Sequence, residues 1–250
     1  MSWAGATVIV TGASRGIGRA VAAAATDRGA RVGAIARTPT EGFASQCADV
    51  GDRAQVDAAV AALERELGPT DILVANAGIG LYGPFVDATV EEIERLVQVN
   101  YLGTVYAVKA VLPGMVERRR GHIVVVASVA GRFGAPFEAA YAATKFAQVG
   151  LAEALSVELS ASGVGVSLID PAIVDTSFFE ARGHAYDRPF PRPIPASRVA
   201  DAVIRAVERD RVETFVPRSF AAASAVRHLA PRLYAWGTRR AFRRELDPHR

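Results

Sequence analysis

The amino-acid sequence predicts an α/β domain built on a doubly wound parallel sheet, with helices on both faces in three αβα layers. Short apolar, β-branched runs recur along the chain, and the clearest read "ATVIV", "RVGAIA", "DILVA", "HIVVVAS" and "VGVSLID". Their hydrophobicity is nearly continuous, which is typical of parallel strands covered on both faces. Helical stretches lie between them, so strand and helix alternate as in doubly wound folds. Half of the 250 residues are hydrophobic, enough for one continuous core.

Residues that end helices set the boundaries of the predicted helices. These helices cover residues 16–28, 52–67, 90–112 and 139–160, and the first three are closed by Gly29, Gly68 and Pro113. The connection between Arg37 and Asp49 is short and contains Pro39 and Gly42. We therefore expect a turn there, in place of the helix that usually joins two parallel strands.

The chain changes character after residue 181. Residues 182–196 contain four of the 13 prolines, which predicts a long surface loop of the kind that serves as a substrate lid. A helix near residues 197–209, a short strand "ETFVP" and a basic helical segment follow. We therefore divide the chain into a main domain, residues 1–217, and a helical extension, residues 218–250.

Composition excludes several classes of protein. Cys47 is the only cysteine, so the chain has neither a disulfide framework nor a thiolate cluster for a metal, and we expect no metal site. The first residues, "MSWAGATVIV", lead directly into a strand without a secretory leader. No stretch reaches the roughly 18 consecutive apolar residues of a membrane-spanning helix. We expect a cytoplasmic protein.

A glycine-rich turn, "TGASRGIG", follows the first predicted strand. Gly12, Gly16 and Gly18 permit a tight turn into the next helix and a close approach of the backbone to a ligand. The free N–H groups at the start of that helix attract phosphate. We interpret the turn, which also contains Ser14, Arg15 and Ile17, as a pyrophosphate cradle.

Five motifs in one order carry a resemblance to a known family. They are the spacing Gly-x-x-x-Gly-x-Gly, "NAG" at residues 76–78, Asn100, Ser128, and "YAATK", whose Tyr141 stands 13 residues after the serine. Together, over residues 7–176, they resemble the short-chain dehydrogenase/reductase family, which implies a Rossmann-like fold. Two departures are "ANAG" for the usual "NNAG", and Pro171-Ala172 for the usual Pro-Gly.

The catalytic residues that this resemblance implies are Asn100, Ser128, Tyr141 and Lys145. Tyr141 and Lys145 lie one helical turn apart on the same face, so an ammonium there would lower the pKa of the phenol and make it a general acid or base. Ser128 ends a predicted strand, where its hydroxyl can bind the substrate oxygen. The resemblance implies that Lys145 also contacts the nicotinamide ribose and that Asn100 holds a water linking Lys145 to solvent.

The cofactor expected is NADP(H) in preference to NAD(H). The second strand ends in Arg37 without the acidic residue that would repel a 2′-phosphate, and Arg15 could help Arg37 to bind that phosphate. Asp49 and Val50 stand where the family's adenine site lies, although either Asp49 or Asp52 could cap the following helix. The remaining cofactor-binding residues implied are Asn76, Ala77, Gly78, Tyr141, Lys145, Pro171, Ile173 and Thr176.

Four phenylalanines flank the catalytic segments and indicate an apolar substrate: Phe133, Phe137, Phe178 and Phe179. We expect an oxidoreductase that transfers hydride between the nicotinamide and a carbonyl or secondary alcohol, with Tyr141 moving the proton. Two alternatives stay open at this point: a dinucleotide-binding regulatory protein without turnover, or a related lyase or epimerase.

The last residues carry most of the positive charge. From Arg218 onward eight arginines face two acidic residues, whereas the whole chain has a net charge of +3. Val226, Leu229, Leu233 and Trp236 recur at helical spacing among these arginines, so the segment could lie on an anionic membrane or pack on its own or a partner subunit. We expect no nucleic-acid binding, because no recognised module is present. The resemblance implies a homodimer or homotetramer, formed through the helices that begin at Val90 and Ala139.

Overall fold

A parallel sheet of seven strands forms the centre of the molecule. The computed structural model describes residues 1–187, 191–243 and 245–246. The strand order is β3-β2-β1-β4-β5-β6-β9, and every neighbouring pair is parallel. The strands are β1 (Thr7–Thr11), β2 (Arg31–Ala36), β3 (Ala44–Cys47), β4 (Ile72–Ala75), β5 (Gly121–Val126), β6 (Val164–Pro171) and β9 (Glu213–Val216). The order reverses between β1 and β4, which confirms the doubly wound sheet.

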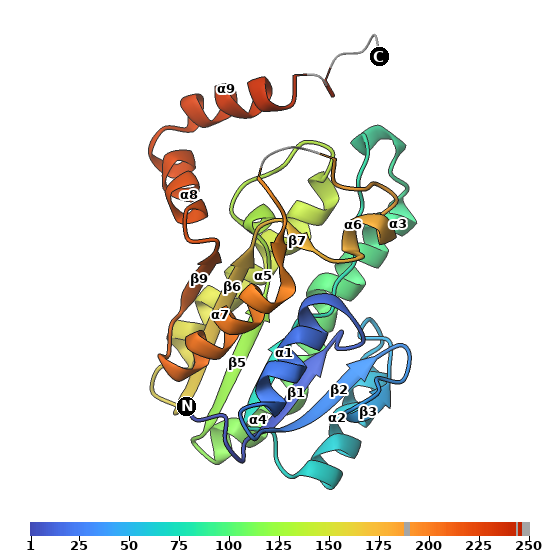
Figure 1. The fold of residues 1–250 in the computed structure, drawn as a ribbon, viewed down its shortest axis with the longest axis vertical. Coiled ribbons are helices and arrows are strands. Elements are labelled where there is room, and N and C mark those ends of the chain that lie inside the picture. The colour runs from blue at the N-terminus through green and yellow to red at the C-terminus, as the bar shows by residue number, and fades with distance from the viewer. Residues whose placement is uncertain (188–190, 244, 247–250) are drawn as a thin grey trace.

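Helices cover both faces of the sheet (Figure 1). One face packs against α1 (Gly16–Thr26) and α7 (Ala196–Glu208), and the other against α2 (Arg53–Leu67), α4 (Gly103–Glu117) and α5 (Ala139–Glu158). Each face has its own apolar core, because successive strand residues point to opposite sides. This two-sided burial explains why the strands are hydrophobic almost without interruption.

The predicted helix 90–112 differs from the structure in two respects. It is divided into α3 (Val90–Leu96), a π-helical segment (Val97–Leu102) and α4, and it continues beyond Pro113 to Glu117. Val111 and Met115, on either side of the proline, are buried against the sheet. This packing outweighs the hydrogen bond that a proline removes from a helix.

Strand β3 was not predicted from the sequence. It is the edge strand of the sheet, and its residues "ASQC" are partly or fully exposed, so it lacks the apolar pattern that reveals the inner strands. No helix lies between β2 and β3 in this described segment, and residues 41–42 form a turn. The expectation of a turn in place of a helix is therefore confirmed.

The predicted lid is anchored at both ends. It begins after α6 (Phe178–Ala181) and ends in β8 (Ile194–Pro195), which pairs with β7 (Val174–Asp175) in a separate two-stranded sheet. Residues 188–190 of the predicted loop lie outside the described residues. Two short 3₁₀ turns, at Phe85–Asp87 and Val129–Gly131, complete the loops on this side of the molecule.

Two further helices follow β9 and project beyond the sheet (Figure 1). They are α8 (Phe220–Leu229) and α9 (Pro231–Ala241). Pro231 occupies the first turn of α9, so the basic segment is divided into two helices. Among the described residues, no helix is long and apolar enough to cross a membrane.

His122 on β5 is a buried titratable group away from the cofactor side of the sheet. Its Nε2 lies 2.8 Å from the Ser167 hydroxyl, and its Nδ1 lies 3.8 Å from an Asp210 carboxylate oxygen. Burial lowers the pKa of His122 to about 4, although Asp210 acts in the opposite direction. The fold therefore requires the neutral imidazole.

We predict that His122 makes the protein sensitive to mild acid. Between pH 6.5 and the folded-state pKa of about 4, His122 binds a proton in the unfolded chain but not in the folded protein. The contribution of the neutral imidazole to stability is therefore complete above pH 6.5 and is lost as the pH falls. The free energy of unfolding should fall by about 2 to 3 kcal/mol between pH 7 and pH 4.5 from this group alone. In urea unfolding, the free energy of unfolding should fall more steeply with decreasing pH in the wild type than in His122→Gln. Parallel pH dependences of the two proteins would refute this prediction.

Candidate active site

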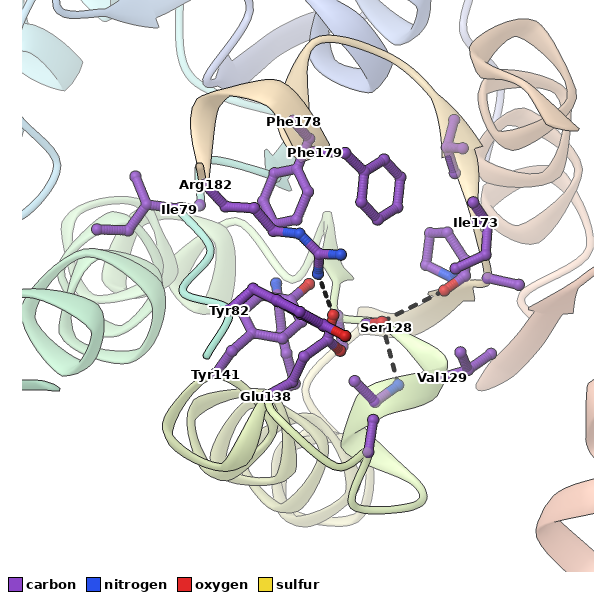
Figure 2. Close-up of a pocket in the computed structure, with 18 of the residues that line it drawn as sticks. Ile79, Tyr82, Ser128, Val129, Glu138, Tyr141, Ile173, Phe178, Phe179 and Arg182 are labelled. Atoms are coloured by element: carbon purple, nitrogen blue, oxygen red, sulfur yellow. Dashed lines mark hydrogen bonds and ion pairs between the residues drawn. The ribbon is translucent and has the colours of Figure 1, made fainter. Parts of the chain in front are cut away.

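One continuous cavity of about 740 Å³ opens at the carboxyl ends of the strands. Its walls come from the glycine turn after β1, from the ends of β2, β4, β5 and β6, and from α6, α8 and α9. Ligands of open α/β sheets bind at this edge, next to the point where the strand order reverses. Figure 2 shows the part of the cavity around Ser128 and Tyr141.

The glycine turn has a shape that larger residues could not adopt. Gly12 has φ +68°, and a Cβ there would lie 2.8 Å from the Ala77 Cα. A Cβ on Gly18 would lie 2.3 Å from the Gly12 carbonyl oxygen, so Gly18 packs the turn without lining the cavity. Gly12, Ser14, Arg15, Gly16 and Ile17 do line it, at the start of α1. The shape of the turn, at the start of α1, is compatible with a pyrophosphate.

Thr11 joins the glycine turn to the predicted "NAG" segment. Its hydroxyl accepts hydrogen bonds from the backbone N–H groups of Asn76 (3.0 Å) and Ala77 (3.1 Å). The Asn76 amide in turn donates to the Thr11 carbonyl at 3.0 Å. Asn76, Ala77 and Gly78 all line the cavity. Sequence reasoning missed Thr11, whose only signal is a hydroxyl at the end of a buried strand.

The far end of the cavity contains the residues predicted for the adenosine. Arg37, Asp49 and Val50 line it, and Arg15 stands at the neighbouring turn. Although burial acts to raise it, hydrogen bonds from the Gly51 N–H and from Arg95, 2.5 Å away, hold the pKa of Asp49 below its usual value.

The helix cap, left open by the sequence, belongs to Asp52. Its side chain accepts the Gln55 N–H at 3.1 Å, at the start of α2. The Asp49 carboxylate instead accepts hydrogen bonds from Arg95 and from the Gly51 N–H. Arg15 and Arg37 are exposed, and neither forms a salt bridge within the part of the chain that the structure describes. Two guanidinium groups therefore remain available to a phosphate.

Ser128 and Tyr141 lie together on the cavity wall (Figure 2). The Ser128 hydroxyl caps the turn that starts at Val129 by accepting the Ala130 N–H at 3.1 Å, and it donates to the Pro171 carbonyl at 3.4 Å. A hydrogen bond between Ser128 and the phenol acts to lower the pKa of Tyr141. The two hydroxyl groups are thus neighbours on the cavity wall, as binding of one substrate oxygen by both would require.

The pKa of Tyr141 moves in the direction opposite to our prediction. Burial is the main cause of its increase, and the neighbouring Glu138 carboxylate adds to it. The Lys145 Nζ lies 5.7 Å from the centre of the tyrosine ring. Burial also lowers the pKa of Lys145 to about 7, so its charge is only partly present near neutral pH. The expected ammonium effect is outweighed because both groups are buried.

A buried amide network holds Lys145 in place. The Nζ donates to the Gln148 side-chain oxygen at 2.8 Å and to the Val126 carbonyl at 3.2 Å. The Gln148 amide group donates to the Asn100 carbonyl at 2.9 Å and to the Thr104 hydroxyl at 2.7 Å. Lys145 is therefore connected to Asn100 through a side chain of the protein.

Asn100 uses its side chain to hold the loop after β4. Its amide oxygen accepts the Ile79 N–H at 2.8 Å, and its amide nitrogen donates to the Ile79 carbonyl and the Thr144 hydroxyl, both at 3.0 Å. Sequence reasoning found Asn100 by resemblance but missed Gln148. The available signal was a glutamine on a predicted helix three residues after the lysine, at a position that faces the core.

An ion pair between Glu138 and Arg182 lies beside Tyr141 (Figure 2). The Arg182 guanidinium carbon lies 4.7 Å from the centre of the Tyr82 ring and 4.5 Å from that of Phe179. The side chains of the pair are 16% and 4% exposed, respectively. Glu138, immediately before α5, and Arg182, at the start of the predicted lid, thus place two opposite charges on the cavity wall. The sequence did not reveal this pair because the partners are 44 residues apart.

Three of the four predicted substrate phenylalanines line the cavity: Phe133, Phe178 and Phe179. Phe178 lies against Tyr141, with 5.7 Å between the ring centres. Phe137 does not line the cavity, so this prediction was wrong. Its backbone has φ +65°, and its ring packs on Tyr82 with centres 5.8 Å apart. Phe137 thus supports the wall from behind.

The chemical groups that the site offers are the hydroxyl, phenol and amine of Ser128, Tyr141 and Lys145. In the residues that the structure describes, no group of three His, Cys, Asp or Glu side chains is placed to hold a metal ion. The ligand that the glycine turn fits is a dinucleotide, given the cradle after β1 and the polar residues at the ends of β2 and β4. The fold and the site together define a dinucleotide-binding α/β protein.

Comparison with known proteins supports this class of protein. Residues 6–187 match the family model described as short chain dehydrogenase. The chain belongs to the short-chain dehydrogenase family, as the five motifs suggested.

The similarity to known relatives and solved structures covers most of the chain. A bovine 3-ketodihydrosphingosine reductase is 38% identical over 70% of this chain, which spans 58% of that relative's length. The rat dehydrogenase/reductase SDR family member 7B is 32% identical over 92% of this chain and 79% of the relative. A short-chain dehydrogenase structure from Burkholderia phymatum in complex with NAD has a TM-score of 0.83 and 26% identity, covering 93% and 96% of the two chains.

We predict that Gln148 is a positioning residue for Lys145. Gln148→Met removes the acceptor of the Lys145 Nζ and should lower the pKa of the lysine, whereas Gln148→Glu supplies a negative charge and should raise it. The pH profile of kcat/KM should shift in opposite directions in the two variants. A purely structural role would lower the rate and the melting temperature in both without such opposite shifts.

Proposed function

We propose that this protein is an NADP(H)-dependent oxidoreductase that interconverts a carbonyl and a secondary alcohol on an apolar substrate, acting chiefly as a reductase. The observation that carries the proposal is the proximity of the Ser128 and Tyr141 hydroxyls on a cavity wall formed largely by apolar side chains. The names of two relatives, the 3-ketodihydrosphingosine reductases of cattle and Bacteroides thetaiotaomicron, support reduction of a keto group.

Different residues of the chain carry different steps of the proposed reaction. The dinucleotide supplies or accepts the hydride when bound. The Ser128 hydroxyl donates a hydrogen bond to the substrate oxygen and stabilises charge that develops there. Burial keeps the Tyr141 phenol protonated near neutral pH, so in the reductive direction its proton is available to the same oxygen. Lys145, held by Gln148, provides the neighbouring amine as the phenol gives up its proton.

Preference for NADP(H) is proposed from charge at the adenosine end of the cavity. Arg15 and Arg37 are exposed there, and the one acidic side chain among its predicted residues, Asp49, is bonded to Arg95 and Gly51. A 2′-phosphate would therefore meet two guanidinium groups and no uncompensated carboxylate.

Assembly and location stay predictions. On α5, Ala143, Gly150, Ala154 and Val157 are exposed at roughly helical spacing, as a helix that packs on a second subunit requires. This arrangement supports the expected homodimer or homotetramer. A cytoplasmic location, with or without contact of the basic segment to a membrane surface, is likewise still a prediction.

We predict that Tyr141→Phe abolishes most turnover while leaving the cofactor bound. Loss of the proton donor should lower kcat/KM by about 100- to 10,000-fold. NADPH oxidation with a panel of apolar ketones, aldehydes and quinones measures turnover, and quenching of protein fluorescence measures NADPH binding. Wild-type protein that binds NADPH tightly but reduces no compound of the panel would favour the regulatory alternative.

We predict that Arg37→Asp reverses the cofactor preference. The new carboxylate would repel a 2′-phosphate and accept hydrogen bonds from a free ribose, so the ratio of kcat/KM for NADPH to that for NADH should fall by about tenfold or more. Arg65→Asp, at an exposed arginine in the last turn of α2, is the matched control. Equal ratios in the wild type and Arg37→Asp would contradict the role of Arg37.

A further inference from the structure

The helices α8 and α9, with the described residues that follow them (242–243 and 245–246), form an arm that borders the cavity and is attached at both ends. Near its start the Phe133 ring lies 6.2 Å from the Phe220 ring and 6.1 Å from the Tyr234 ring. The Arg227 guanidinium donates to the Arg132 carbonyl at 2.6 Å. At its end the Tyr82 hydroxyl donates to the Glu245 carboxylate at 2.9 Å. The arm therefore joins the loop before α5 to the loop after β4.

The inner face of the arm is a wall of the same cavity that contains Ser128 and Tyr141. The residues that carry this wall are Ala223, Val226, Leu233, Trp236, Ala241 and Phe242. Val226 is 40% exposed, Leu233 57% and Trp236 61%, so large apolar side chains border the cavity without being buried by the chain itself. An apolar ligand in the cavity would cover them, and this burial would favour binding.

The two faces of α9 differ in chemistry. Gly237 and Ala241 line the cavity, while Arg232 and Arg239 lie seven residues apart, on the opposite side of the helix. The arginines are exposed. The apolar face is thus turned toward the catalytic groups and Arg232 and Arg239 away from them, although Arg240 lies beside the wall, with its guanidinium carbon 5.9 Å from the centre of the Trp236 ring. This orientation of the apolar face favours a ligand of the active site over a membrane as its occupant.

We propose that the arm binds the hydrocarbon chain of the substrate, and hence that the substrate is a long-chain ketone lipid whose carbonyl lies at Tyr141. This inference rests on the proposed reductase function. The wall follows α9 from Leu233 to Phe242, which at 1.5 Å per residue extends for roughly 14 Å. That length suits an extended alkyl chain better than a short ketone. Because one cavity runs from Ser128 to the arm, a single substrate molecule can hold its reacting group at Ser128 and its hydrocarbon chain against the arm.

The test compares two leucines that are both exposed on the arm. Leu233 lines the cavity, whereas Leu229 is 86% exposed and does not line it, so Leu233→Asp and Leu229→Asp introduce the same change on and off the wall. We would measure kcat/KM with NADPH for straight-chain methyl ketones from butanone to dodecanone. Binding of dodecanone would be measured separately by titration calorimetry.

In the wild type, kcat/KM should rise with chain length by up to about fourfold for each methylene that is buried. The ratio of kcat/KM for dodecanone to that for butanone should fall at least tenfold in Leu233→Asp and stay as in the wild type in Leu229→Asp. A rate independent of chain length, or equal effects of the two variants, would overturn the proposal.

Two further outcomes distinguish failure of the chain site from failure of the reductase function. If no carbonyl compound is reduced, the proposed function fails, and the arm is then judged by calorimetry alone: dodecanone binding that Leu233→Asp abolishes supports the chain site, and its absence in the wild type refutes it. If Leu233→Asp instead changes the oligomeric state or the binding to anionic vesicles without changing the chain-length dependence, the wall serves a second copy or a membrane and the proposal is wrong.

Discussion

The structure of the site depends on keeping one lysine amine away from water. Lys145 is 4% exposed, and its Nζ is held by the Val126 carbonyl and the Gln148 side chain. A buried amine needs such partners, because an unpaired one would cost several kcal/mol or lose its proton. The π-helical segment places Asn100 where its carbonyl accepts from Gln148 and its side chain fixes the loop at Ile79. The partners of one amine thus connect β4, β5, α5 and the π-helical segment.

Burial sets the acidity of the site more strongly than charge does. The pKa of Tyr141 is raised and that of Lys145 is lowered, and in both cases burial is the largest cause. Each change favours the neutral form, so the site holds its proton on the phenol. The phenol is therefore in the protonated form that a general acid requires. The arm and the lid contribute to this state because both form walls of the cavity and limit the access of water.

The sequence predicted what depends on local patterns. The inner strands and the glycine turn follow from hydrophobic runs and backbone requirements. Ser128, Tyr141 and Lys145 were identified through the resemblance of five ordered motifs to a known family. Strand β3 escaped prediction because an exposed edge strand needs no apolar pattern. The Glu138–Arg182 pair and the Gln148 bonds join residues that are far apart in the chain or undistinguished in it, so only the folded structure brings them to light. Phe137 was misplaced because an aromatic side chain near a site can also support its wall from behind.

The Glu138–Arg182 pair links the acidity of Tyr141 to the position of Arg182, at the start of the predicted lid. Glu138 raises the pKa of Tyr141, and Arg182, which follows α6, acts to lower it. With Arg182 paired to Glu138, the arginine offsets the carboxylate and eases the release of the phenol proton. If α6 moved outward, the carboxylate would stand alone beside the phenol, which would then keep its proton. In the proposed reductase, the strength of the acid at the substrate oxygen would thus depend on where one arginine of a neighbouring loop lies.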